Sequence, residues 1–83
     1  MKYRSRTEIA SAILEAANGG TTKTRIMYKG FLSYAQLKEY LQMLTASGLL
    51  ENTDPAMYKT TSKGLRFLEA TGKMAQMMQM AEV

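Results

Sequence analysis

The sequence predicts a small, mainly α-helical domain with one β-hairpin, and three observations lead to this fold class. A capped amphipathic helix is expected over residues 33–47. Its apolar side chains, Leu37, Leu41 and Leu44, recur at spacings of four and three and so share one face, and Gly48 follows as a left-handed C-terminal cap. Two short apolar runs around a proline-bearing turn then indicate a hairpin. This order is that of a winged helix-turn-helix, with a three-helix core, a two-stranded wing and a C-terminal helix.

The composition fits one small globular unit. The chain has 83 residues, of which 46% are hydrophobic and 22% charged, so a single core is expected. We expect residues 1–70 to form the winged helix-turn-helix domain and residues 71–83 to form a Met-rich C-terminal helical extension. No apolar run approaches the roughly 20 residues that span a bilayer, and the start of the chain lacks a secretion signal. A cytoplasmic protein without membrane contact is therefore expected.

The residue types present argue against an enzyme. The sequence contains neither histidine nor cysteine, which removes the commonest general base, the thiol nucleophile and the usual transition-metal ligands. No phosphate-binding loop is present, and no polar cluster indicates a small-molecule ligand, a metal or another cofactor. The carboxylates are scattered singly along the chain, at Glu8, Glu15, Glu39, Glu51, Asp54, Glu69 and Glu82.

The net charge of +4 points to an anionic partner, most simply nucleic acid. Most of the excess lies before residue 30, where only Glu8 and Glu15 oppose the cations. These cations are Lys2, Arg4, Arg6, Lys23, Arg25 and Lys29.

A first helix is expected over residues 6–18, because Ser5 and Glu8 form a capping-box pattern ahead of a broad apolar stripe. Its role is structural. The basic arm ahead of it, Lys2 and Arg4 with Arg6, either contacts phosphates or is an ordinary frayed terminus.

A second, shorter helix is expected over residues 23–29, after a flexible turn and a cap at Thr22. Its cations, Lys23, Arg25 and Lys29, would lie in solvent at the turn, where a helix-turn-helix meets the DNA backbone. The two apolar residues that follow, Phe31 and Leu32, are expected in the core.

The third helix carries the candidate recognition face. Ser33 and Gln36 form a second capping-box pattern. The outward side chains supply donors, acceptors and a cation, as contacts to base edges and phosphates require; alternatively, they are ordinary solvated positions. These side chains are Ser33, Gln36, Lys38, Glu39 and Gln42. Glu39 would accept from a cytosine amine or pair with a neighbouring cation. Tyr34 is expected to contact the nucleic acid, and Tyr40 is expected in the core.

The hairpin is expected to have strands near residues 49–52 and 57–61. Its tip carries Asp54 and no lysine, so any contact from the wing is expected from Lys59 on the return strand.

A last helix begins near Thr61 or Ser62, and its apolar side chains Leu65, Phe67 and Leu68 would close the core. Gly72 marks a bend or a weak point. Beyond it, a methionine stripe either forms a dimer through paired helices or belongs to a frayed tail. The expected dimer residues are Met74, Met77, Met78 and Ala81.

Two stretches, Gly48–Glu51 and Tyr58–Leu68, carry a family resemblance. Up to about Ala70 the chain resembles the small winged-helix transcriptional regulators common in archaea, some of which dimerise through a long C-terminal helix. The resemblance implies a nucleic-acid-binding role, with base contacts in the major groove from Ser33, Tyr34, Gln36, Lys38 and Gln42. It implies phosphate contacts from Lys23, Arg25, Lys29 and the N-terminal arm.

The sequence therefore predicts a DNA-binding, dimeric transcriptional regulator, cytoplasmic and associated with the nucleoid. Its two recognition helices would meet half-sites of double-stranded DNA about 10 bp apart. The alternative is a winged-helix module for protein–protein interaction within a larger complex.

Overall fold

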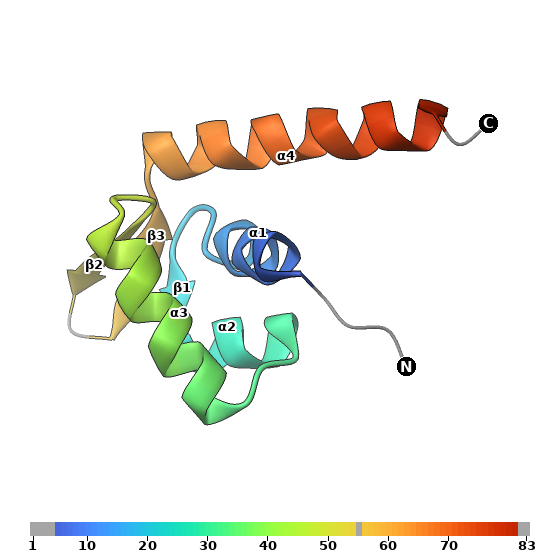
Figure 1. The fold of residues 1–83 in the computed structure, drawn as a ribbon. Coiled ribbons are helices and arrows are strands. Elements are labelled where there is room, and N and C mark those ends of the chain that lie inside the picture. The colour runs from blue at the N-terminus through green and yellow to red at the C-terminus, as the bar shows by residue number, and fades with distance from the viewer. Residues whose placement is uncertain (1–4, 55, 82–83) are drawn as a thin grey trace.

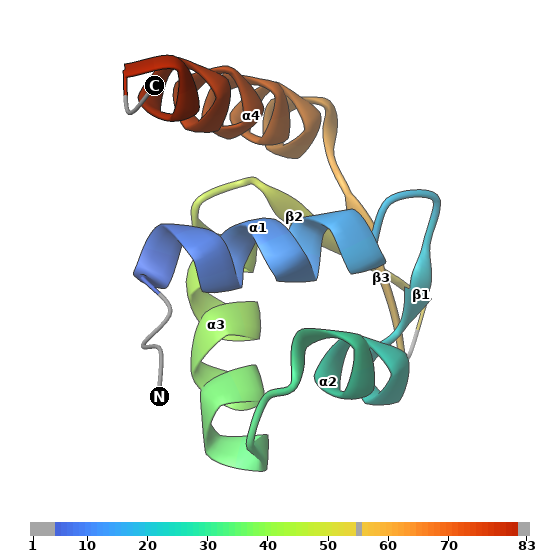
Figure 2. The same ribbon diagram turned by 90° about the vertical axis from the view of Figure 1, so that its right-hand side faces the viewer.

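The computed structural model describes the backbone of residues 5–54 and 56–81, and the side chains of residues 5–53 and 56–73. The elements in chain order are α1 (Arg6–Ala16), β1 (Thr21–Thr22), α2 (Lys23–Gly30), α3 (Tyr34–Ala46), β2 (Leu50–Asp54), β3 (Met57–Thr60) and α4 (Ser62–Ala81). In two perpendicular views, α1 lies between α4 on one side and α2 and α3 on the other (Figure 1, Figure 2). The predicted class, a three-helix core with a hairpin and a C-terminal helix, is confirmed.

The helices begin where the capping patterns predict. The Ser5 hydroxyl accepts the backbone N–H of Glu8, and the Glu8 carboxylate accepts that of Ser5, both at 3.1 Å. Ser33 and Gln36 form the same reciprocal pair, again at 3.1 Å. The Thr22 hydroxyl caps α2 by accepting a backbone N–H at 3.3 Å. Each cap satisfies amides that the first helical turn leaves without a partner.

The end of α3 is stabilised by two features. Gly48 takes the left-handed conformation, with φ +79°, as predicted for the residue after the helix. The Lys63 ammonium donates to the Ser47 carbonyl at 2.8 Å, which places a cation at the negative end of the helix dipole.

The sheet has one more strand than predicted. Its order is β1-β3-β2, and all pairs are antiparallel. The additional strand, β1, pairs Thr21 with Tyr58 and Thr22 with Met57. We predicted a flexible turn here, because two residues are too short to show the alternation that indicates a strand.

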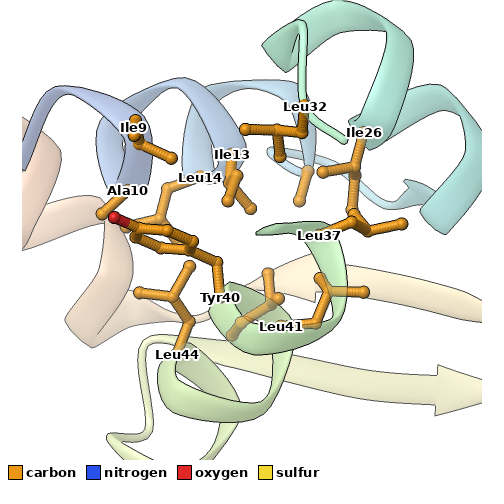
Figure 3. Close-up of a cluster of buried hydrophobic side chains, with 12 residues drawn as sticks. Ile9, Ala10, Ile13, Leu14, Ile26, Leu32, Leu37, Tyr40, Leu41 and Leu44 are labelled. Atoms are coloured by element: carbon orange, nitrogen blue, oxygen red, sulfur yellow. The ribbon is translucent and has the colours of Figure 1, made fainter. Parts of the chain in front are cut away.

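The core gathers side chains from α1, α2, α3 and β2 (Figure 3). The predicted leucine face of α3 is buried there, and so is Tyr40, as predicted. Phe67 and Leu68 of α4 pack against this cluster while half-buried. The buried apolar residues are Ile9, Ala10, Ile13, Leu14, Ala17, Ile26, Leu32, Leu37, Tyr40, Leu41, Leu44 and Leu50.

Two residues expected in the core lie outside it. Phe31 is 85% exposed, because the left-handed residue that ends α2 turns its ring outward while Leu32 points inward. Leu65 is 43% exposed. It lies about 100° around α4 from Gly64, and Gly64 is the position that approaches the body of the domain.

The start of α4 is bonded to the segment that follows α3. The Thr61 hydroxyl donates to the Gly48 carbonyl at 2.6 Å and accepts the Gly64 N–H at 3.1 Å, so Thr61 is the cap rather than Ser62. The helix then continues through Gly72 to Ala81 without interruption. The boundary expected between residues 70 and 71 therefore lies inside one helix.

Candidate nucleic-acid interface

An open hollow lies between α3, the start of α2 and the hairpin. Its floor is apolar and comes from Leu37 and Leu41, whereas its rim carries two ammonium groups, two amides and two phenols. Such a rim can bind a strongly charged, hydrogen-bonding ligand. The lining residues are Lys23, Tyr34, Leu37, Lys38, Leu41, Gln42, Thr45, Ala46, Asn52 and Tyr58.

Helix geometry explains the α3 side of the hollow. Tyr34, Lys38, Gln42 and Thr45 follow one another at spacings of four, four and three, which places them on one flank of the helix. Three of these, Tyr34, Lys38 and Gln42, belong to the predicted set of base contacts. The structure brings these three together.

The hairpin explains the opposite side. Asn52 and Tyr58 are register partners on β2 and β3, so their side chains project from the same face of the sheet. Strand β1 pairs with β3 at Tyr58 and leads directly into Lys23, the first residue of α2. The short strand that the sequence did not reveal therefore places Lys23 beside the wing.

The other two predicted base contacts, Ser33 and Gln36, form the capping box at the start of α3. Gln36 lies two residues before Lys38, about 200° around the helix, and so faces the other flank of α3. Its Oε1 accepts the Ser33 N–H in the capping box. This bond takes one of the two lone pairs of Oε1, so the role of Gln36 as a base contact stays a prediction.

Arg6 lies on that other flank as well. Its guanidinium is 5.2 Å from the centroid of the Tyr40 ring, forms a 3.5 Å ion pair with Glu39 and donates to the Met43 sulfur at 3.4 Å. Of the two alternatives for Glu39, the structure shows pairing with a cation. Arg6, a predicted phosphate contact, thus connects the start of α1 to α3.

The remaining predicted phosphate contacts do not line the hollow. Arg25 and Lys29 are exposed on α2. Lys59 alternates with Tyr58 along β3 and so points to the opposite face of the hairpin, where its register partner is Glu51. Lys2 and Arg4 lie outside the described residues.

The predicted dimer residues lie within α4, but their side chains are outside those described. They are Met74, Met77, Met78 and Ala81.

Sequence reasoning missed three polar residues of the hollow, Thr45, Asn52 and Tyr58. The alternation of Leu50 and Asn52 along the first hairpin strand was the available signal, since it places Asn52 on the same face as a buried leucine. The proximity of Asn52 and Tyr58 to α3 depends on how the hairpin folds back, which no local pattern expresses.

From α2 to Lys38 in α3, the chain beside the hollow carries only positive charge. No acidic residue occurs between Glu15 and Glu39, a stretch that contains Lys23, Lys38 and two further cations. Glu39 itself is paired with Arg6. Within the described residues no group of three or more potential metal ligands is present. No helix in the described part of the chain is long and apolar enough to cross a membrane.

The fold defines a class of protein. It is that of helix-turn-helix domains in which a β-hairpin, the wing, lies beside α3. The family model for winged helix-turn-helix proteins matches residues 3–79, and the chain belongs to that family. This membership agrees with the expectation of a non-enzymatic protein and confirms the family resemblance.

Among solved structures, the chain is similar to Sso10a-2, described as a DNA-binding protein from Sulfolobus solfataricus. The TM-score is 0.85 at 23% sequence identity, over 95% of this chain and 86% of that one. A comparison with curated proteins finds no significant match.

Proposed function

We propose that this protein binds double-stranded DNA with α3 in the major groove and regulates transcription. The observation that carries the proposal is the joint placement of Lys23, Lys38 and Gln42 around one hollow, together with the absence of any acidic residue in the sequence between Glu15 and Glu39. The family and the described binding activity of Sso10a-2 support it.

Different residues of the hollow would contact phosphates and bases. Lys23 and Lys38 supply charge for a phosphate lying over the apolar floor, with Asn52 as a further donor from the wing. Gln42 would contact a base through both its amide oxygen and its amide nitrogen. Unlike Gln36, it takes no part in a capping box. Arg25 and Lys29, together with the arm, would contact phosphates beyond the hollow.

We further propose that two copies dimerise through α4. Met74, Met77, Met78 and Ala81 follow spacings of three and four, the pattern of a helix-pairing stripe. In this arrangement residues 1–70 are the DNA-binding unit and residues 71–83 the dimerisation unit of an archaeal-type regulator. A protein with this role would lie in the cytoplasm on the nucleoid.

The first experiment titrates a labelled random 30-mer duplex with the protein at several salt concentrations and follows fluorescence anisotropy. Each phosphate contact contributes about −0.9 to the slope of log affinity against log salt. Lys23→Ala and Lys38→Ala should each weaken binding to every sequence and reduce the slope by about one. Arg66→Ala removes one positive charge from an exposed position on α4, outside residues 71–83, and is the control.

Absence of binding at low salt would overturn the DNA-binding proposal. Equal binding by the wild type and both lysine variants would overturn the placement of the contact at the hollow. A protein partner that binds with little salt dependence would then favour the interaction-module alternative.

The dimer is tested separately by sedimentation equilibrium, comparing the wild type with Met77→Lys. A monomeric wild type at micromolar concentration would contradict dimerisation and leave DNA binding by single copies intact.

A further inference from the structure

Gln42 projects from the face of α3 that points away from the core. It lies two residues after Tyr40 and two residues before Leu44, which places it about 200° around the helix from each of them. Those two side chains are buried in the core, at 3% and 2% exposure, whereas Gln42 is exposed (Figure 3). A residue in this position reaches outward toward any surface on which α3 lies.

The Gln42 carboxamide is not used within the protein. In the part of the chain that the structure describes, it makes no hydrogen bond to another residue. The other glutamine of α3, Gln36, accepts the Ser33 N–H in the capping box. Glu39 also projects away from the core, but its carboxylate pairs with Arg6 at 3.5 Å. Gln42 therefore offers an unused donor and an unused acceptor on this face of α3.

The neighbours of Gln42 in the hollow differ in chemistry. Lys38, one helical turn earlier, and Lys23, at the start of α2, line the same hollow. Their ammonium groups can hold phosphates but contain only donors. Ala46, one turn after Gln42, lines the hollow with a methyl group and is exposed. Along α3, an ammonium group, a carboxamide and a methyl group therefore follow one another at intervals of one turn.

We propose that Gln42 selects adenine in the major groove and that Ala46 contacts the methyl group of a nearby thymine. This inference rests on the proposed duplex binding and adds the base pairs that the protein prefers. The carboxamide oxygen accepts from adenine N6 and its nitrogen donates to adenine N7, a pair of contacts that no other base offers in this groove. Residues 42 and 46 lie about 6 Å apart along the helix axis, close to the rise of two base pairs. The thymine therefore lies within about two base pairs of the adenine.

The test begins with a pool of duplexes randomised in their central base pairs, from which those that bind the wild type are selected and sequenced. The selected duplex should contain A·T pairs, and fluorescence anisotropy then compares it with altered forms of equal charge. Replacing the selected A·T pair by G·C should weaken binding by about 5-fold to 150-fold. Replacing its adenine by 7-deazaadenine, which lacks the N7 acceptor, should weaken binding by about 2-fold to 12-fold. Replacing the nearby thymine by uracil, which lacks the methyl group, should weaken it by about 4-fold.

Three variants assign these preferences to residues, and circular dichroism verifies that each is folded. Gln42→Ala lacks the carboxamide and should bind the adenine and 7-deazaadenine duplexes equally. Ala46→Gly lacks the methyl group and should bind the thymine and uracil duplexes equally. Lys38→Ala is the control, which should weaken binding of every duplex by one common factor and keep the preferences of the wild type.

The outcomes separate this proposal from the proposed function. Binding of the pool without enrichment of A·T pairs would overturn the proposal and leave duplex binding intact. An unchanged preference for adenine over 7-deazaadenine in Gln42→Ala would also overturn it. Equal binding of the thymine and uracil duplexes by the wild type would overturn the role of Ala46. Absence of binding to the whole pool at low salt would overturn the proposed function as well.

Discussion

The hydroxyl of Thr60 donates a 2.6 Å hydrogen bond to the carbonyl oxygen of Leu14. The Thr60 N–H also donates to the Ala17 carbonyl at 3.1 Å, so one buried residue at the end of β3 satisfies two acceptors near the end of α1. These acceptors are among the carbonyls that a helix C-terminus leaves without a partner. These bonds fix the hairpin to the three-helix core. They thereby position the hairpin residues that line the hollow.

We predict that Thr60→Val destabilises the domain by about 1–3 kcal/mol, because it keeps the shape of the side chain but leaves the Leu14 carbonyl without its buried donor. Urea unfolding followed by circular dichroism measures the loss. Thr53→Val, the same change at an exposed position on β2, is the control and should stay within about 0.5 kcal/mol of the wild type. A smaller loss for Thr60→Val than for the control would contradict the role assigned to this bond.

The two glycines of α4 should respond oppositely to alanine. A Cβ on Gly64 would clash with the Leu49 carbonyl oxygen and lie 2.6 Å from Thr60 Cγ2, so Gly64→Ala should destabilise the domain by about 3 kcal/mol. A Cβ on Gly72 would meet nothing within 4 Å, so Gly72→Ala should stabilise the helix by up to about 1 kcal/mol. Thermal unfolding of the two variants tests both signs, and a stabilising Gly64→Ala would show that α4 does not approach the body this closely.

Gln36 should act mainly through the cap of α3. Gln36→Ala removes the acceptor for the Ser33 N–H and should lower stability by about 0.5–1 kcal/mol. Gln36→Glu keeps an acceptor and places negative charge at the positive end of the helix, so its stability should match or exceed that of the wild type. The comparison is made by urea unfolding. Equal stability of the wild type and Gln36→Ala would contradict the structural role.

Neutralising Glu39 should strengthen duplex binding at low salt. The carboxylate lies on α3 beside the proposed contact face. In its ion pair with Arg6, the Arg6 side chain is 66% exposed and the Glu39 side chain 63%, so Glu39→Gln should cost little stability. The gain in affinity, measured by anisotropy, should shrink as salt rises. Glu69→Gln breaks a similar exposed pair with Lys73 on α4 and should leave duplex affinity unchanged. A loss of affinity in Glu39→Gln would indicate that Glu39 accepts a hydrogen bond from DNA.

Local signals predicted most of the fold. Capping boxes such as Ser33 with Gln36 act within one helical turn, and the left-handed Gly48 acts at one residue, so both are visible in a short window of sequence. The leucine face of α3 follows from helical periodicity alone. These features depend on neighbours along the chain, and for that reason they were predicted correctly.

The errors concern features that depend on distant residues. Strand β1 exists because Thr21 and Thr22 meet β3 more than thirty residues later. An apolar residue after a helix is commonly buried, but the left-handed backbone at Phe31 turns its ring outward. For the candidate site, periodicity identified Lys38 and Gln42, whereas the wing residues beside them required the folded hairpin.

The attachment of α4 has a mechanical consequence. Thr61 and Lys63 bond to carbonyls at and just beyond the end of α3, so the two helices meet at one junction, and about 30 Å of helix extends from it. Figure 1 shows this arm running past α1 to the far side of the molecule. Torque applied near Ala81 is therefore delivered to the junction beside α3, and a partner that holds the arm also sets the direction in which α3 points.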